Sequence, residues 1–187
     1  MTAAIVARTV PADGRVLETD RLVLRLLVTD DAPFILQLVN DPDWLRYIGD
    51  KGVRNLDDAR AYIESGPMAM YERVGFGLFR VELKAGGTPI GMCGLIKRDT
   101  LPDVDIGFAF LPQFRAQGYG REAARATLAY GRDVVGLKRI IAITSPDNET
   151  SGRLLEAVGL RFERSFDISN DDRSVRLYGW TAEPASA

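Results

Sequence analysis

The sequence predicts an α/β fold in which about seven strands alternate with about four helices. Three observations predict it: short apolar runs bounded by turn residues, segments with apolar residues at helical spacing, and a glycine turn between two strand-like runs. The chain has 187 residues, 46% of them hydrophobic, enough to bury the core of a single domain over residues 1–187. We expect about residues 1–15 and 182–187 to be frayed.

The first half is expected to supply a strand, two helices and a hairpin. Residues 21–27 read as the strand. Thr29 is placed to cap a helix that ends at 40–43, and this helix has one apolar face: Ala32, Ile35, Leu36 and Val39. A short second helix lies around residues 59–63. The runs 79–84 and 90–96 are expected to pair through the turn 85–87.

The second half alternates strands and helices more regularly. We expect strands at 104–110, 139–143, 160–163 and 175–180, of which the continuous apolar run 139–143 is typical of a sheet centre. One helix follows residue 120. Another begins near Asp147 or Asn148 and ends at Gly159, where a C-terminal capping glycine belongs. The polar residues 169–172 join the last two strands.

Composition excludes several classes of function. The net charge is −2 without a long block of one sign, so we expect no nucleic-acid or membrane partner, and the apolar runs are too short for a membrane span. There is no histidine, which excludes His-ligated metals and Ser-His or Cys-His nucleophiles, and we expect no metal. The single cysteine, Cys93, lies in an apolar run and favours a buried structural thiol over a nucleophile. We expect a cytoplasmic protein.

The segment 108–124 carries the strongest functional signal. It reads as a buried strand, a tight loop with Gly118 and Gly120, and a helix. Glycines let the backbone approach a ligand, and the first amides of a helix favour an anion. The segment is therefore a candidate phosphate-binding loop; the alternative is a strand-to-helix turn that merely needs glycine.

The spacing Arg115-x-x-Gly118-x-Gly120 resembles the acetyl-CoA signature of the GNAT (Gcn5-related N-acetyltransferase) family. Residues 17–25 and 40–42 look like the branch that contains ribosomal-protein N-terminal acetyltransferases, and the resemblance covers about residues 18–180. It implies a mixed, largely antiparallel sheet with helices on both faces. It also implies that the sheet splays open between its fourth and fifth strands, here 104–111 and 139–145.

The resemblance implies acetyl-CoA as co-substrate and assigns residues to it. An amide at Phe110 or a neighbour would meet the thioester carbonyl. Amides of the following loop would hold the pyrophosphate, with added charge from Arg115. In the later segment 147–160, Asn148 would contact the pantetheine side of CoA. The alternative role of Asn148, given equal weight, is a plain helix N-cap. The cofactor-binding candidates are Phe110, Leu111, Arg115, Ala116, Gln117, Gly118, Tyr119, Gly120, Asn148 and Ser151.

Asp105 and Phe110 are the catalytic candidates. Asp105 shares one face of its strand with Gly107, Ala109 and Leu111, and such small residues leave room for a ligand. Asp105 would take the proton of an amine through water; the alternative is an ordinary exposed aspartate. Leu155 departs from the family pattern, because many members carry there a tyrosine that protonates the leaving thiolate.

Trp44 and Tyr47 are expected in a loop after the first helix, which in the family borders the acceptor site. They are the substrate-binding candidates, and the alternative is that they anchor an irregular segment to the core. The acceptor would be a peptide N-terminus or a small-molecule amine. Its identity stays open, as does formation of a homodimer.

The leading hypothesis is an enzyme that transfers acetyl from acetyl-CoA to a primary amine by direct attack. A second is a non-catalytic acyl-CoA-binding or sensing module, motivated by Leu155; release of CoA with a panel of amines discriminates the two. A third is dinucleotide binding, because residues 118–123 formally fit Gly-x-Gly-x-x-Ala. Binding of NAD instead of CoA would favour it.

Overall fold

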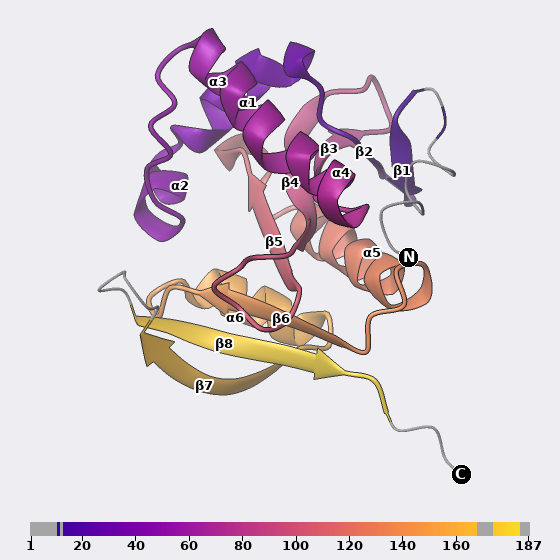
Figure 1. Cartoon of the computed structure of the whole chain (residues 1–187), viewed down its shortest axis with the longest axis vertical. Helices are drawn as coiled ribbons and strands as arrows, with labels where there is room; N and C mark the ends of the chain where they lie inside the picture. The colour runs from indigo at the N-terminus through magenta and orange to yellow at the C-terminus, as the bar shows by residue number, and fades with distance from the viewer. Residues whose placement is uncertain (1–10, 12, 168–173, 184–187) are drawn as a thin grey trace.

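The computed structural model describes residue 11 and residues 13–167 and 174–183. The ends expected to fray lie largely outside the described residues, as does the turn 169–172. The described strands form one sheet in the order β1-β2-β3-β4-β5-β6-β8-β7 (Figure 1). Their bounds are β1 Arg15–Glu18, β2 Leu22–Arg25, β3 Leu78–Leu83, β4 Pro89–Ile96, β5 Asp105–Phe110, β6 Arg139–Thr144, β7 Arg161–Asp167 and β8 Ser174–Thr181.

The predicted mixed, largely antiparallel sheet is confirmed. Every neighbouring pair of described strands is antiparallel except β5 and β6, which are parallel and share one registered residue pair, Asp105 with Ile141. In Figure 1, β6, β8 and β7 lie across the lower part of the molecule while β5 runs steeply down to them. The sheet thus splits between β5 and β6. The prediction of about seven strands missed β1, a four-residue edge strand.

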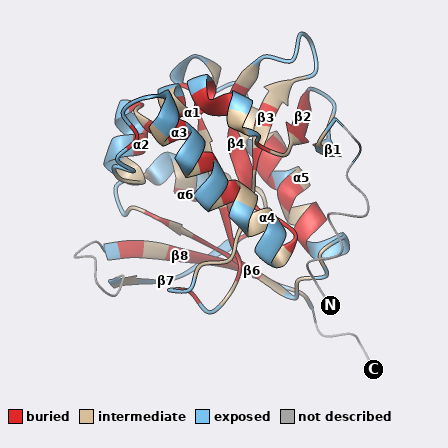
Figure 2. Cartoon of the chain, turned by 45° about the horizontal axis from the view of Figure 1, so that its top comes forward, coloured by how far each residue is buried: buried red, intermediate tan, exposed pale blue. Residues whose placement is uncertain are grey.

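Helices cover both faces of the sheet. The bounds are η1 Thr29–Asp31, α1 Ala32–Val39, α2 Pro42–Tyr47, α3 Leu56–Ile63, η2 Glu64–Met68, α4 Ala69–Val74, η3 Pro112–Phe114, α5 Tyr119–Asp133 and α6 Glu149–Ala157. Side chains of α1, α2 and α3 pack with Met92 and Leu111 in one apolar cluster. Those of α5 and α6 pack with Ile106 and Phe110 in another. Buried residues concentrate where β4 meets these helices (Figure 2).

Two local predictions for the first half were wrong. Thr29 does not cap α1; it begins a 3₁₀ turn, and the buried Asp31 accepts the Val28 amide at 3.1 Å. Segment 40–43 ends α1 but also starts a new helix, because Asp41 accepts the amides of Asp43 and Trp44 and so caps α2. The short second helix continues as a π-turn, η2, and then as α4, although Pro67 lies inside it.

The central strand β4 tolerates no side chain at Gly94. A Cβ there would lie 2.1 Å from the carbonyl oxygen of Gly77 in the neighbouring backbone. We predict that Gly94→Ala lowers the free energy of unfolding by about 3 kcal/mol, because a packed strand pair must separate. Gly66→Ala is the control: its Cβ would meet nothing within 4 Å. The free energy of unfolding of that variant should rise by about 0.5–1 kcal/mol, because alanine loses less backbone entropy on folding than glycine does. Equal urea midpoints for the two variants would contradict this account.

Candidate active site

The split in the sheet leaves part of the β5 backbone facing open space. The Leu111 amide donates to the Ile90 carbonyl at 2.9 Å, so these residues form a hydrogen-bonded pair of β4 and β5. Because such pairs alternate along an antiparallel ladder, the N–H and C=O of Phe110 point away from β4, toward β6. The Phe110 carbonyl accepts the Nε–H of Arg115 at 2.8 Å. Because the amide of Phe110 points to the same side as its carbonyl, away from β4, it faces the split.

A cavity of about 970 Å³ follows this split. One end lies between the loop before α5 and the start of α6, and the other lies beneath α2, α3, η2 and α4. The cavity brings together most of the predicted site residues: Trp44, Tyr47, Asp105, Phe110, Arg115, Ala116, Gly118, Gly120, Asn148 and Ser151. Leu111, Gln117 and Tyr119 are not part of its wall. Leu111 is buried in the core on the α1 side.

The loop before α5 has the backbone of an anion-binding turn. Ala116 and Gly118 both take left-handed conformations, with φ of 57° and 82°, and Gly118 is the N-cap of α5. The first amides of that helix have no partner within it, so they and the helix dipole favour a negative group here. Gly120 has a packing role as well, because a Cβ there would lie 3.1 Å from Leu154 of α6.

Arg21, the residue before β2, makes contacts that brace this loop, and sequence reasoning missed them. Arg21 donates to the carbonyl of Gln117 at 3.1 Å and to the carboxylate of Glu122 at 2.7 Å, and its guanidinium stacks over the ring of Tyr119. Glu122 also accepts the hydroxyl of Thr19 at 2.6 Å. Burial tends to raise the pKa of Glu122, but the bonds from Thr19 and Arg21 outweigh it and lower the pKa.

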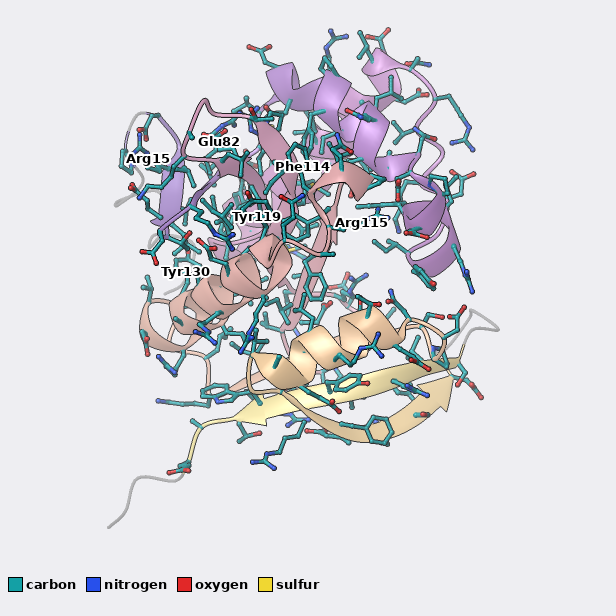
Figure 3. All side chains as sticks on the ribbon, turned by 180° about the vertical axis from the view of Figure 1, so that it is seen from behind. Arg15, Glu82, Phe114, Arg115, Tyr119 and Tyr130 are labelled. Carbon is teal, nitrogen blue, oxygen red and sulfur yellow. The ribbon has the colours of Figure 1, made fainter. Side chains whose placement is uncertain are left out.

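Arg115 lies between the loop and α2 (Figure 3). Its guanidinium forms ion pairs with Asp41 and Asp43 in addition to its bond to Phe110. The predicted role was added charge at the phosphates. That role stays a prediction, whereas the observed contacts show a structural role: they tie the end of β5 to the start of α2.

The start of α6 forms the opposite wall. Asn148 is the N-cap that the sequence indicated, since its Oδ1 accepts the Ser151 amide at 3.1 Å. This leaves its side-chain NH₂ available to a ligand. Arg121 and Arg153 are exposed and line the same end of the cavity. Leu155 is buried in the core, so position 155 supplies no proton.

Asp105 is buried, with 1% of its surface exposed, and lines the cavity. Sequence reasoning left open whether it is an exposed residue, and the structure excludes that. Arg98 donates its Nε–H to both carboxylate oxygens, at 2.9 and 3.1 Å. Burial raises the pKa of Asp105, although Arg98 acts in the opposite direction. A carboxylate with a raised pKa is better matched to accepting a proton near neutrality.

Trp44 and Tyr47 lie on helix α2 and not in a loop as predicted. Both line the cavity, and Trp44 also packs in the core, so both of its expected roles are compatible. Arg46, between them, reaches across to Asp147 at 2.7 Å and joins α2 to the segment before α6. The indole N–H of Trp44 is buried and finds no hydrogen-bond partner in the described part of the chain.

The single cysteine, Cys93, lies in the core. The Cys93 thiol is buried and contacts the hydroxyl of Thr127 at 3.3 Å, and burial raises its pKa to about 12. It is a structural thiol, as predicted.

Within residues 13–167 and 174–183, no cluster of three or more potential metal ligands is found, and no helix is long and apolar enough to cross a membrane.

A model of the GNAT acetyltransferase domain matches residues 21–161. This chain belongs to the GNAT acetyltransferase family. It is therefore an acyl-CoA-dependent acetyltransferase. The dinucleotide hypothesis is wrong: β5-α5-β6 is a parallel unit, but the other described neighbours pair antiparallel, unlike the parallel sheet of a dinucleotide fold.

Relatives cover nearly the whole chain. The uncharacterized N-acetyltransferase YoaA of Bacillus subtilis (strain 168) is 30% identical over 79% of this chain and 84% of its own length. A GNAT-family acetyltransferase from Bacillus anthracis is 28% identical with a TM-score of 0.73, over 88% of this chain and 97% of that structure.

Two more distant structures share the fold. The ribosomal-protein-S5-alanine acetyltransferase of Vibrio fischeri is 18% identical, with a TM-score of 0.74 over 91% of this chain and 98% of its own. The microcin C7 self-immunity acetyltransferase MccE, solved with acetyl-CoA and AMP, is 16% identical. Its TM-score is 0.75, and the match covers 93% of this chain and 99% of that structure.

We predict that Trp44→Phe changes the free energy of unfolding by less than about 1 kcal/mol. The substitution loses packing but removes a buried donor whose lack of a partner costs about 1–3 kcal/mol. Trp44→Ala removes the ring as well and should lower the free energy of unfolding by about 3–5 kcal/mol. Urea denaturation of both variants measures the difference. A Phe variant as unstable as the Ala variant would show that the indole N–H is satisfied in solution.

Proposed function

We propose that this enzyme transfers an acetyl group from acetyl-CoA to a primary amine, either a peptide N-terminus or a small-molecule amine, by direct attack. The observation that carries the proposal is the Phe110 amide, aimed into the split between β5 and β6. It lies beside a cavity that begins at the N-terminus of α5. Few other reactions need a carbonyl-binding amide and an anion-binding turn along one channel.

Each part of the channel has a task in this reaction. The amides from Ala116 to Gly120 would hold the pyrophosphate, with Arg121 and Arg153 at the rim. The Phe110 amide would donate to the thioester oxygen and stabilise the charge that develops there as the amine nitrogen attacks. The carbon–sulfur bond then breaks. Because a thiol has a pKa near 8.5, the departing thiolate can take a proton from water without a residue at position 155.

Asp105 is the proposed proton acceptor. Its burial and its place on the cavity wall let it take the amine proton through one or two waters. Arg98 acts as a positioning residue, because it holds both carboxylate oxygens and acts against the rise in the pKa of Asp105 that burial causes. An α-amine, with a pKa near 7.7–8.0, needs less of this help than a lysine near 10.4.

We predict that acetyl-CoA binds with a stoichiometry of about 1:1 and raises the Tm. Ala116 allows a matched test, since it is exposed, lines the cavity and has a φ of 57°, a conformation that Asn and Asp accept better than Ala. Ala116→Asp places a carboxylate at the phosphates and should weaken binding at least about tenfold at low salt. Ala116→Asn has the same shape without the charge and should bind as wild type does. Equal affinities for the two variants would contradict this phosphate site.

We predict that Asp105→Asn lowers kcat/KM for the amine by about a hundredfold at pH 7 and hardly changes the Kd of acetyl-CoA. The loss should shrink as the pH rises, because more of the amine is then neutral without a base. In wild type, kcat/KM for the amine should rise with pH as Asp105 loses its proton. This rise should occur at a pH above the usual range for aspartate, because burial raises the pKa of Asp105. CoA release at several pH values measures both effects.

Two outcomes would count against this account. An unchanged rate for Asp105→Asn at pH 7 would leave water as the base. If acetyl-CoA binds but none of a broad panel of amines releases CoA, the chain is instead a sensor of acyl-CoA.

A further inference from the structure

The end of the cavity away from the phosphate-binding loop has a wall that the acetyl transfer itself does not require. We call this end, beneath α2, α3, η2 and α4, the acceptor chamber. Its wall is mainly apolar and aromatic, and includes Trp44, Tyr62, Pro67, Met70, Leu78 and Ile96. A catalytic base and a thioester need only a small part of this surface. The remaining surface is available to the body of the acceptor.

The carboxylates of the described cavity wall are already paired. Asp105 holds Arg98, and Asp41 and Asp43 both hold Arg115. An acceptor with a second ammonium group would therefore lose its hydration in the chamber without gaining a free carboxylate. An apolar body would lose no hydrogen bonds on entering and would bury its surface.

One position in the wall sets the depth of the chamber. Tyr62, Gly66 and Met70 follow one another at four-residue spacing along α3, η2 and α4, and all three line the cavity. Gly66 contributes no side chain between the other two, and a Cβ built there would meet nothing within 4 Å. The π-turn lies where such turns often occur, beside a functional site. Gly66 thus leaves a gap that a substrate group can fill.

We propose that the acceptor is an amine with a single positive charge, carried on an apolar and preferably aromatic body, and that Gly66 is the specificity-determining residue that makes room for it. This rests on the proposed function and adds the substrate class. The body lies against the stripe of Tyr62 and Met70, and the amine points toward Asp105.

Three amides with the same α-amine test this inference: glycine amide, phenylalanine amide and lysine amide. In wild type, kcat/KM measured by CoA release should be at least about tenfold higher for phenylalanine amide than for glycine amide. Lysine amide should be no better than glycine amide. Gly66→Phe should remove the advantage of phenylalanine amide, so that the kcat/KM values for phenylalanine amide and glycine amide become equal within about twofold. The Kd of acetyl-CoA should stay the same.

The control is Ala69→Phe, which adds the same ring three residues further on, at an exposed position. It should leave all three rates unchanged. Gly66→Ala, whose Cβ meets no neighbour, shows that the position tolerates substitution without unfolding. A wild type that prefers lysine amide, or a Gly66→Phe variant that keeps the preference for phenylalanine amide, would overturn the inference.

Calorimetric titration of the amides into protein saturated with CoA separates this inference from the proposed function. Tighter binding of phenylalanine amide, lost in Gly66→Phe, supports the chamber even if no acetyl group is transferred. Equal or undetectable binding of the three amides, together with active transfer and no preference among them, overturns the chamber and leaves the transferase intact.

Discussion

The structure depends on an incomplete sheet. β5 and β6 are neighbours, yet one registered residue pair joins them, Asp105 with Ile141, and beyond it the strands separate. Buried backbone amides that lack partners cost free energy, so a split in the middle of a sheet is unfavourable unless something else satisfies it. Here the Phe110 carbonyl is satisfied by Arg115. In the proposed function the Phe110 amide is satisfied by the thioester oxygen, so the split would be both a structural weakness and the binding channel.

Ion pairs hold the two sides of the channel in place. Arg115 joins β5 to α2. Arg21, just before β2, holds Glu122 of α5 and the carbonyl of Gln117 in the loop before that helix. These contacts are partly buried and hydrogen-bonded in several directions, so they order the loop before any ligand arrives. Arg46 and Asp147 cross between the walls as an exposed pair, which contributes little to stability. That link can open and close at low cost, and it lies between α2 and the segment before α6.

How much of this could be predicted from sequence depends on the range of the interactions. The loop at 115–120, the cap at Asn148 and the open point between β5 and β6 follow from local glycine and capping signals or from the family resemblance. The partner of Asp105 could not be predicted in this way, because Arg98 approaches Asp105 only when β4 and β5 pair. The brace between Arg21 and Glu122 joins residues 101 positions apart. The continuation of α3 was missed because Gly66 and Pro67 normally end a helix, whereas here a π-turn carries the chain past them.

The cavity separates two kinds of chemistry along its length. Its phosphate end has helix amides and exposed arginines, which suit a charged and hydrated group. Its other end, the acceptor chamber, has a mainly apolar and aromatic wall, which suits a group with little hydration. Asp105 lies on the cavity wall, where burial raises its pKa and the bond from Arg98 acts against that rise. If Asp105 is the proposed base, an apolar acceptor that displaces water from the chamber would act on it in two opposite directions. Loss of hydration raises the pKa of the carboxyl group, whereas the attraction to Arg98 becomes stronger and lowers it. The body of the acceptor would thus change the pKa of the base as it binds, which couples substrate choice to proton transfer.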